Sequence, residues 1–161
     1  MIEEPGRPGA AGNVPDAVAR LLRGRVEAGP ELWLPVGGGS MGPTIRPPGN
    51  VLLAPGRWPR RGEVWAFVGA DGAIVVHRCE RRAGPGCVFR GDGMAVADPW
   101  VPAARLIGRV VAVADALGQR RLGAADRRLA TGRTLLRRLR RVVWRARKWV
   151  VGTMATTRRG R

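Results

Sequence analysis

The spacing of apolar residues first changes near Gly29 and Pro30. Before this point four apolar residues recur at helical spacing, namely Val18, Leu21, Leu22 and Val26. They predict a short amphipathic helix over residues 15–28. After it, short apolar runs alternate with Gly, Pro and Asp-Gly turns, which predicts β-strands over residues 32–36, 50–54, 63–68, 73–79, 87–90 and 106–113. The chain is therefore predicted to form a mainly β, mostly antiparallel domain.

Beyond residue 118 the chain becomes rich in arginine, and its apolar residues return to helical spacing. After Arg133 one stripe contains Leu135, Leu136, Leu139, Val142, Val143, Ala146, Trp149 and Val150. The arginines lie off this stripe, so we expect a basic amphipathic C-terminal helix. The expected organisation is a flexible segment over 1–14, one domain over 15–118 with its β core at 31–113, and a basic helical tail over 119–161.

The composition agrees with this division. A chain of 161 residues suits one domain, and its 24 glycines and 13 prolines suit short strands joined by tight turns. The formal net charge is +17, and residues 120–161 hold fifteen Lys and Arg against Asp126 alone. We therefore expect an anionic partner to meet the tail and not the β domain.

Cysteine usage and the amino terminus narrow the class of protein. Cys79 and Cys87 are too few for a disulfide framework, and with one histidine they leave too few ligands for a zinc site. We expect reduced thiols, no metal and no cofactor. The amino terminus is acidic, and no apolar run has the length of a signal-peptide core or of a membrane span. These features favour a cytoplasmic protein.

Candidate chemistry is concentrated in five short motifs that follow one another along the β region. They are Ser40-Met41-Gly42-Pro43-Thr44, Arg61-Gly62-Glu63-Val64, Val75-Val76-His77-Arg78, residues 91–98 (Gly-Asp-Gly-Met-Ala-Val-Ala-Asp) and Ile107-Gly108-Arg109-Val110-Val111. Their order resembles that in the type I signal peptidases, which share a fold with the LexA-like self-cleaving repressors. The resemblance implies a signal peptidase-like antiparallel β domain and a serine peptidase activity.

His77, the only histidine, decides the subgroup within this resemblance. Bacterial signal peptidases place a lysine base near this position, whereas the archaeal and endoplasmic-reticulum enzymes place a histidine. The only lysine here is Lys148, in the tail. The resemblance thus implies Ser40 as nucleophile, His77 as general base and an acid from the Gly-Asp motif. Asp98 is the first candidate for that acid and Asp92 the second, and their spacing does not separate them.

The chemistry of these residue types supports the same assignment. A serine hydroxyl is a poor nucleophile unless a base takes its proton, and an imidazole, with an ordinary pKa of about 6.5, suits that task. A carboxylate would hold the imidazole in one tautomer. The triple glycine at 37–39 allows a tight turn in which backbone amides, first that of Ser40, face an oxyanion. The residues expected to border the substrate or the oxyanion are Gly38, Gly39, Met41 and Pro43.

Three departures from the family pattern change the expected activity. Gly38 stands where signal peptidases usually place a second serine that donates to the oxyanion, and loss of one donor lowers the rate roughly a hundredfold or more, so we expect slow catalysis. Asn50 and Glu63 replace common aspartates and are expected to serve structure. No membrane anchor is found, so the expected substrate is a cytoplasmic precursor or leader-type peptide.

Simpler interpretations remain beside this one. Read singly, Ser40 is a loop residue, His77 a structural residue in an apolar strand, and Asp92 part of an Asp-Gly turn. The alternative function is a non-catalytic peptide-binding adaptor with a basic tail. For that tail, Trp144 and Trp149 favour an anionic membrane surface over packing on the domain, and nucleic acid is the less favoured partner.

Overall fold

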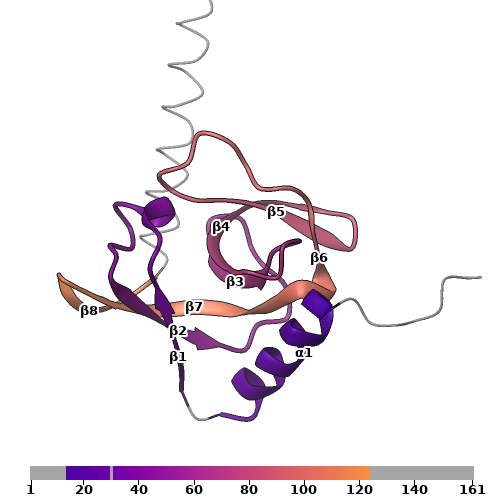
Figure 1. Cartoon of the computed structure of the whole chain (residues 1–161), viewed down its shortest axis with the longest axis horizontal. Helices are drawn as coiled ribbons and strands as arrows, with labels where there is room; N and C mark the ends of the chain where they lie inside the picture. The colour runs from indigo at the N-terminus through magenta and orange to yellow at the C-terminus, as the bar shows by residue number, and fades with distance from the viewer. Residues whose placement is uncertain (1–13, 30, 124–161) are drawn as a thin grey trace, which may run out of the picture. The chain divides into compact units, whose positions relative to one another are not determined.

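The computed structural model describes residues 14–29 and 31–123 of the chain (Figure 1). Helix α1 (Val14–Glu27) has Pro15 and Asp16 in its first turn, where a proline forfeits no hydrogen bond and a carboxylate meets the positive end of the helix. Its buried side, which includes Ala19 and Val26, packs against the sheet. Arg23 also anchors the helix to the sheet, because its Nε donates a hydrogen bond to the Leu106 carbonyl at 2.8 Å.

The strands form a single antiparallel sheet that curls, with α1 beside it (Figure 1). Their bounds are β1 (Leu32–Val36), β2 (Gly49–Ala54), β3 (Val64–Val68), β4 (Ile74–Ala83), β5 (Gly86–Arg90), β6 (Val101–Pro102), β7 (Leu106–Asp115) and β8 (Gly118–Arg121). Two short 3₁₀ helices, η1 (Gly39–Met41) and η2 (Ala103–Arg105), interrupt the connections. The strand order is β1-β2-β7-β3-β4-β5-β6, and β8 pairs with β7.

Strand β7 organises the sheet because it pairs with three other strands. One edge of β7 pairs with β2 over most of its length, with a bulge between Leu52 and Leu53 of β2. The other edge pairs with β3 over residues 106–109 and with β8 over residues 112–115. This arrangement places the β7–β8 hairpin beside the start of β2, where Asn50 pairs with Ala114.

Strand β3 lies in the middle of the core and is buried on both faces. Alternate residues enter two apolar clusters, because side chains of a strand point to opposite faces of the sheet. The first cluster contains Val64, Ala66 and Val68 with Met41, Ile45 and Val76, and the second contains Trp65 and Phe67 with Cys79, Cys87, Phe89, Val101 and Leu106. Burial of each large apolar side chain contributes about 1.5–3 kcal/mol, so β3 and its partner β4 form a rigid support.

The observed elements confirm the prediction of a mainly β chain with one short helix before an antiparallel sheet. Each of the six predicted strands is present, and β4 continues to Ala83, beyond its predicted end at Cys79. Strands β6 and β8 were not predicted. Strand β8 also takes the sheet into the first residues of the segment assigned to the tail. The predicted C-terminal helix and nearly all of the predicted flexible segment lie outside the described residues.

The helices of the described residues can be compared with the length and apolar character of a membrane span. Within 14–29 and 31–123, no helix combines the length and the apolar character needed to cross a bilayer.

Candidate active site

Ser40 lies in a turn at the protein surface, and packing against the core fixes this turn. It is the middle residue of η1, which follows β1 after Gly37 and Gly38. The Gly42 amide donates to the Gly39 carbonyl at 3.0 Å, closing the short helix. The next side chain, Met41, is only 1% exposed and anchors the turn in the first apolar cluster. Ser40 itself remains partly exposed, so its hydroxyl is presented from a fixed backbone.

His77 comes to this turn from β4. Its backbone pairs with Trp65 of β3, and its ring meets Phe67 edge to face, with ring centroids 6.4 Å apart. The side chain is largely buried, but Nε2 reaches the Ser40 Oγ at 2.8 Å. Residues that are 37 positions apart in the sequence therefore make a direct hydrogen bond. The imidazole is therefore buried on its strand but keeps one ring nitrogen in contact with the Ser40 hydroxyl.

Asp98 holds the other ring nitrogen of the histidine. Its Oδ2 lies 2.7 Å from His77 Nδ1, and its own backbone amide donates to the Phe89 carbonyl at 2.8 Å. A carboxylate accepts only, so Nδ1 carries the proton and donates it toward Asp98. Nε2 is then the acceptor for the Ser40 hydroxyl. The three side chains form one directed hydrogen-bond chain, Ser40 to His77 to Asp98.

Asp92 has a different partner from Asp98. It forms a two-pronged ion pair with Arg78, with Nε–Oδ1 at 2.8 Å and Nη2–Oδ2 at 2.6 Å, and it also accepts from the Thr44 hydroxyl. Arg78 Nη1 donates to the Gly62 carbonyl at 2.7 Å. Asp92 therefore joins β4 to the segment that follows Ser40. Sequence spacing left the two aspartates unranked, and the contacts place Asp98 on the imidazole.

Gly91 and Gly93 bring the loop after β5 against the Ser40 turn. The Gly93 amide donates to the Ser40 carbonyl at 2.8 Å. A Cβ added at Gly91 would lie 2.5 Å from the Ser40 carbonyl oxygen and 3.0 Å from His77 Nε2. Only a residue without a side chain fits there. Sequence reasoning treated these glycines as part of a motif or a turn, and nothing in their spacing indicated this packing.

Replacing Gly91 by alanine is expected to lower the free energy of unfolding by about 1–3 kcal/mol, because the new methyl group overlaps backbone that cannot move away. Urea denaturation followed by far-UV circular dichroism measures this. The matched control is Gly24→Ala in α1, where an added Cβ meets nothing within 4 Å. That change should raise stability by up to about 1 kcal/mol through helix propensity. An unchanged urea midpoint for Gly91→Ala would contradict the close packing.

The four residues expected to border the substrate or the oxyanion divide into two groups. Gly38, Gly39 and Pro43 are exposed beside Ser40. The side chain of Met41 instead lies in the core, where it anchors the turn. Only the backbone of this residue is therefore accessible to a ligand. The expectation that Met41 borders the substrate is corrected to that extent.

The two cysteines are poor competitors for the role of nucleophile. Cys79 and Cys87 are free thiols in the second apolar cluster. Burial, with a smaller contribution from the neighbouring Cys87, raises the pKa of Cys79 to about 12, and burial also raises the pKa of Cys87. A thiol is a nucleophile only as the thiolate, so neither is reactive near neutral pH. Among the described residues, no group of three or more His, Cys, Asp or Glu side chains is placed to hold a metal ion.

Comparison of the chain with family models and with curated proteins finds no match.

Proposed function

We propose that this protein is a serine endopeptidase in which Ser40 is the nucleophile, His77 the general base and Asp98 the residue that orients the base. The single observation that supports this most is the unbroken chain of contacts, 2.8 Å from Oγ to Nε2 and 2.7 Å from Nδ1 to Oδ2. A nucleophile, a base and an orienting carboxylate within hydrogen-bond reach of one another are the arrangement that activates a serine hydroxyl.

The reaction follows from the direction of these hydrogen bonds. As Oγ attacks the peptide carbonyl carbon, Nε2 takes the hydroxyl proton, and Asp98 stabilises the resulting imidazolium. The tetrahedral intermediate collapses when Nε2 gives this proton to the amine, and the C–N bond breaks to leave an ester on Ser40. Nε2 then deprotonates a water that attacks the ester carbonyl. The acid product leaves, and Oγ recovers its proton through His77.

The negative oxygen of the intermediate needs donors, and the Ser40 turn offers backbone amides. The first amides of a helix have no acceptor within that helix, and Ser40 is the second residue of η1. Gly38 precedes it in an extended conformation, with φ −88° and ψ 145°, and has no side chain to add a donor. We therefore propose that stabilisation of the oxyanion relies on backbone amides, which is consistent with slow turnover.

The family assignment remains a proposal that rests on the sequence motifs. The motifs fall on the Ser40 turn, on the segment leading into β3, on β4, on the loop after β5 and on β7. The segments that resemble the type I signal peptidases are thus the same segments that carry the candidate catalytic residues. A curled antiparallel sheet is also consistent with the signal peptidase and LexA-like fold. We propose membership of the subgroup with a histidine base.

The proposed substrate is a precursor or leader-type peptide that adds a strand to the sheet at β1. Among the described strands, β1 pairs only with β2, so its other edge is free beside the Ser40 turn. Pro35 fits an edge strand because proline has no N–H for a second neighbour. A peptide that pairs with this edge gains main-chain hydrogen bonds and is held in extended form for cleavage.

A cluster of arginines favours a second candidate function, a non-catalytic adaptor that binds a polyanion. The cluster consists of five exposed arginines for which no carboxylate partner is found among the described residues, namely Arg57, Arg60, Arg61, Arg81 and Arg82. The loop and the strand that carry them are adjacent, since the Gly62 amide donates to the Cys79 carbonyl at 2.8 Å and Arg82 lies over the Trp58 ring at 4.6 Å. A phosphate-bearing partner therefore has a binding surface on the β domain besides the basic tail.

A fluorophosphonate probe tests the enzyme against the adaptor. Ser40 is the only serine in the chain, so intact-mass and peptide-mass spectrometry should find one adduct, on the peptide that contains it. His77→Ala should prevent labelling, because the hydroxyl loses its base. An unlabelled protein that cleaves no member of a peptide library contradicts the enzyme. If that same protein binds DNA in a salt-sensitive manner and loses binding in Arg81→Ala/Arg82→Ala, the adaptor is supported.

A further inference from the structure

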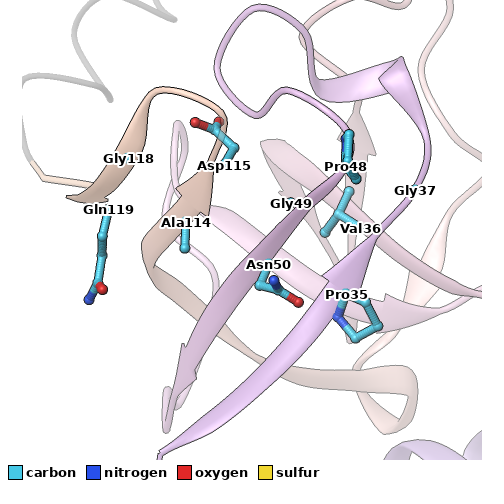
Figure 2. Close-up of a pocket in the computed structure, with 10 residues that line it drawn as sticks. All are labelled: Pro35, Val36, Gly37, Pro48, Gly49, Asn50, Ala114, Asp115, Gly118 and Gln119. Carbon is cyan, nitrogen blue, oxygen red and sulfur yellow. The ribbon is translucent and has the colours of Figure 1, made fainter.

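An open groove of about 630 Å³ lies on the sheet near the Ser40 turn (Figure 2). Its size falls within the range of ligand-binding clefts, roughly 300–1,000 Å³. The groove is formed where the end of β1, the start of β2 and the β7–β8 hairpin meet. It is lined by Pro35, Val36, Gly37, Pro48, Gly49, Asn50, Ala114, Asp115, Gly118 and Gln119.

Two amide side chains stand on the same face of the sheet at this groove. Strand register aligns Pro35 with Asn50, Asn50 with Ala114, and Ala114 with Gln119. Residues paired across antiparallel strands point to the same face, so these four form one row across β1, β2, β7 and β8. Figure 2 shows the side chains of Asn50 and Gln119 projecting from this row. Both are exposed, and neither amide has a hydrogen-bond partner among the described residues.

The one charged group that lines the groove is already compensated. The Asp115 carboxylate accepts from Arg120 at 2.8 and 2.9 Å, from the Leu117 amide at 3.0 Å and from the Arg46 amide at 3.1 Å. The hydrogen bond from Arg120 holds the pKa of this carboxyl well below its usual range, so it stays ionised and paired. The groove therefore presents small apolar surfaces and two neutral amides, a lining that suits an uncharged ligand.

The groove is also close to the proposed nucleophile along the chain. Gly37 lines it and stands three residues before Ser40, so their Cα atoms are at most about 11 Å apart. Arg120 connects the hairpin rim to the same turn by donating to the Thr44 carbonyl. An extended peptide therefore needs only three or four residues to pass from the groove to the Ser40 hydroxyl.

We propose that this groove is an exosite that binds an extended, uncharged segment of the substrate peptide through Asn50 and Gln119. The inference rests on the proposed peptidase function. A carboxamide offers one acceptor and two donors, which matches the C=O and N–H of a peptide group whatever the side chains are. The groove continues from the free edge of β1, so an extended peptide is the ligand that fits it. Because the charge of Asp115 is compensated, the groove gives no preference for acidic or basic ligands.

The first experiment measures peptide binding in a variant that cannot hydrolyse the peptide. Full-length Ser40→Ala is titrated with a pool of acetylated, amidated 12-residue peptides without charged side chains, and ¹⁵N–¹H spectra report the side-chain NH₂ signals. The full chain contains only one other Asn or Gln side chain, that of Asn13, so the NH₂ signals are readily assigned. Both should shift on addition of the pool. Signals that remain unmoved while backbone amides of β1 shift would overturn the exosite and leave the peptidase proposal standing.

Kinetics then test the length dependence. Asn50→Ala/Gln119→Ala should raise KM for a cleaved 12-residue peptide about tenfold, the effect of losing two hydrogen bonds. It should leave kcat/KM unchanged within about twofold for a four-residue peptide spanning the same bond, because that peptide does not reach the groove. The control, Glu27→Ala, changes an exposed residue on α1 and should alter neither.

Other outcomes give clear alternatives. Equal losses for long and short peptides would assign the two amides to structure. An unchanged KM together with a change of oligomeric state in analytical ultracentrifugation would assign the groove to a second copy of the chain. Each result contradicts the exosite. Failure of the wild-type protein to cleave any peptide would instead contradict the proposed function, and the binding titration would still report on the groove.

Discussion

Replacing Ser40 by alanine is expected to abolish peptide hydrolysis while the fold stays intact. The change removes one partly exposed oxygen and leaves Met41 anchored in the core, so the far-UV spectrum and melting temperature should not change. His77→Ala should have the same effect on turnover, because the hydroxyl has no other base within reach among the described contacts. Loss of either member of such a pair typically costs about 10³-fold or more in kcat.

The measurement is cleavage of a peptide library followed by mass spectrometry, with each variant purified in parallel. The double variant gives an internal check, since two residues that act as one unit should cost no more together than singly. A Ser40→Cys variant provides a second readout. Its new thiol should react with iodoacetamide, whereas Cys79 and Cys87 stay protected by burial. Cleavage that persists in Ser40→Ala would refute the assignment.

Asp98→Asn and Asp92→Asn are expected to separate activity from stability. At position 98 the amide no longer enforces the Nδ1–H tautomer, so kcat should fall about 10²- to 10⁴-fold, with little change in the free energy of unfolding. At position 92 the change leaves the largely buried Arg78 without its charge partner. Breaking a buried ion pair from one side costs roughly 3–5 kcal/mol, so Asp92→Asn should lose stability first.

Steady-state kinetics and urea denaturation of the same preparations decide this. Asp92→Asn is expected to keep measurable turnover under conditions where it remains folded. The opposite pattern, a stable and inactive Asp92→Asn beside an active Asp98→Asn, would exchange the roles of the two carboxylates.

Local pattern was sufficient for most of the fold. β3 is an uninterrupted apolar run between Glu63 and Gly69, and such a run forms a strand where both of its faces are covered. β1 is apolar except for Pro35 and is bounded by Glu31 and Gly37. β8 could not be predicted this way, since Gly118–Arg121 contains no apolar residue. It exists because β3 covers only part of one edge of β7, leaving hydrogen-bonding groups over residues 112–115 for a hairpin partner.

The residues of the candidate site could be predicted from the sequence, but the contacts between them could not. A serine after three glycines, a lone histidine and two aspartates can be read from the printed chain, and their order suggested peptidase chemistry. The need for glycine at position 91 could not be read, because it depends on the backbone of a turn fifty residues earlier. The Asn50 and Gln119 row was missed for the same reason, since three strand pairings bring it together.

By itself, the sequence determined which functional groups the chain has and where its backbone can be extended or must turn, because both depend on neighbours within a few residues. Only the tertiary structure decided what each group does. Asp92 and Asp98 are chemically identical and six residues apart, yet one pairs with Arg78 and the other with His77 Nδ1. The role of a carboxylate is set by the charge or proton within about 3 Å of it, and strand register and loop packing determine that neighbour.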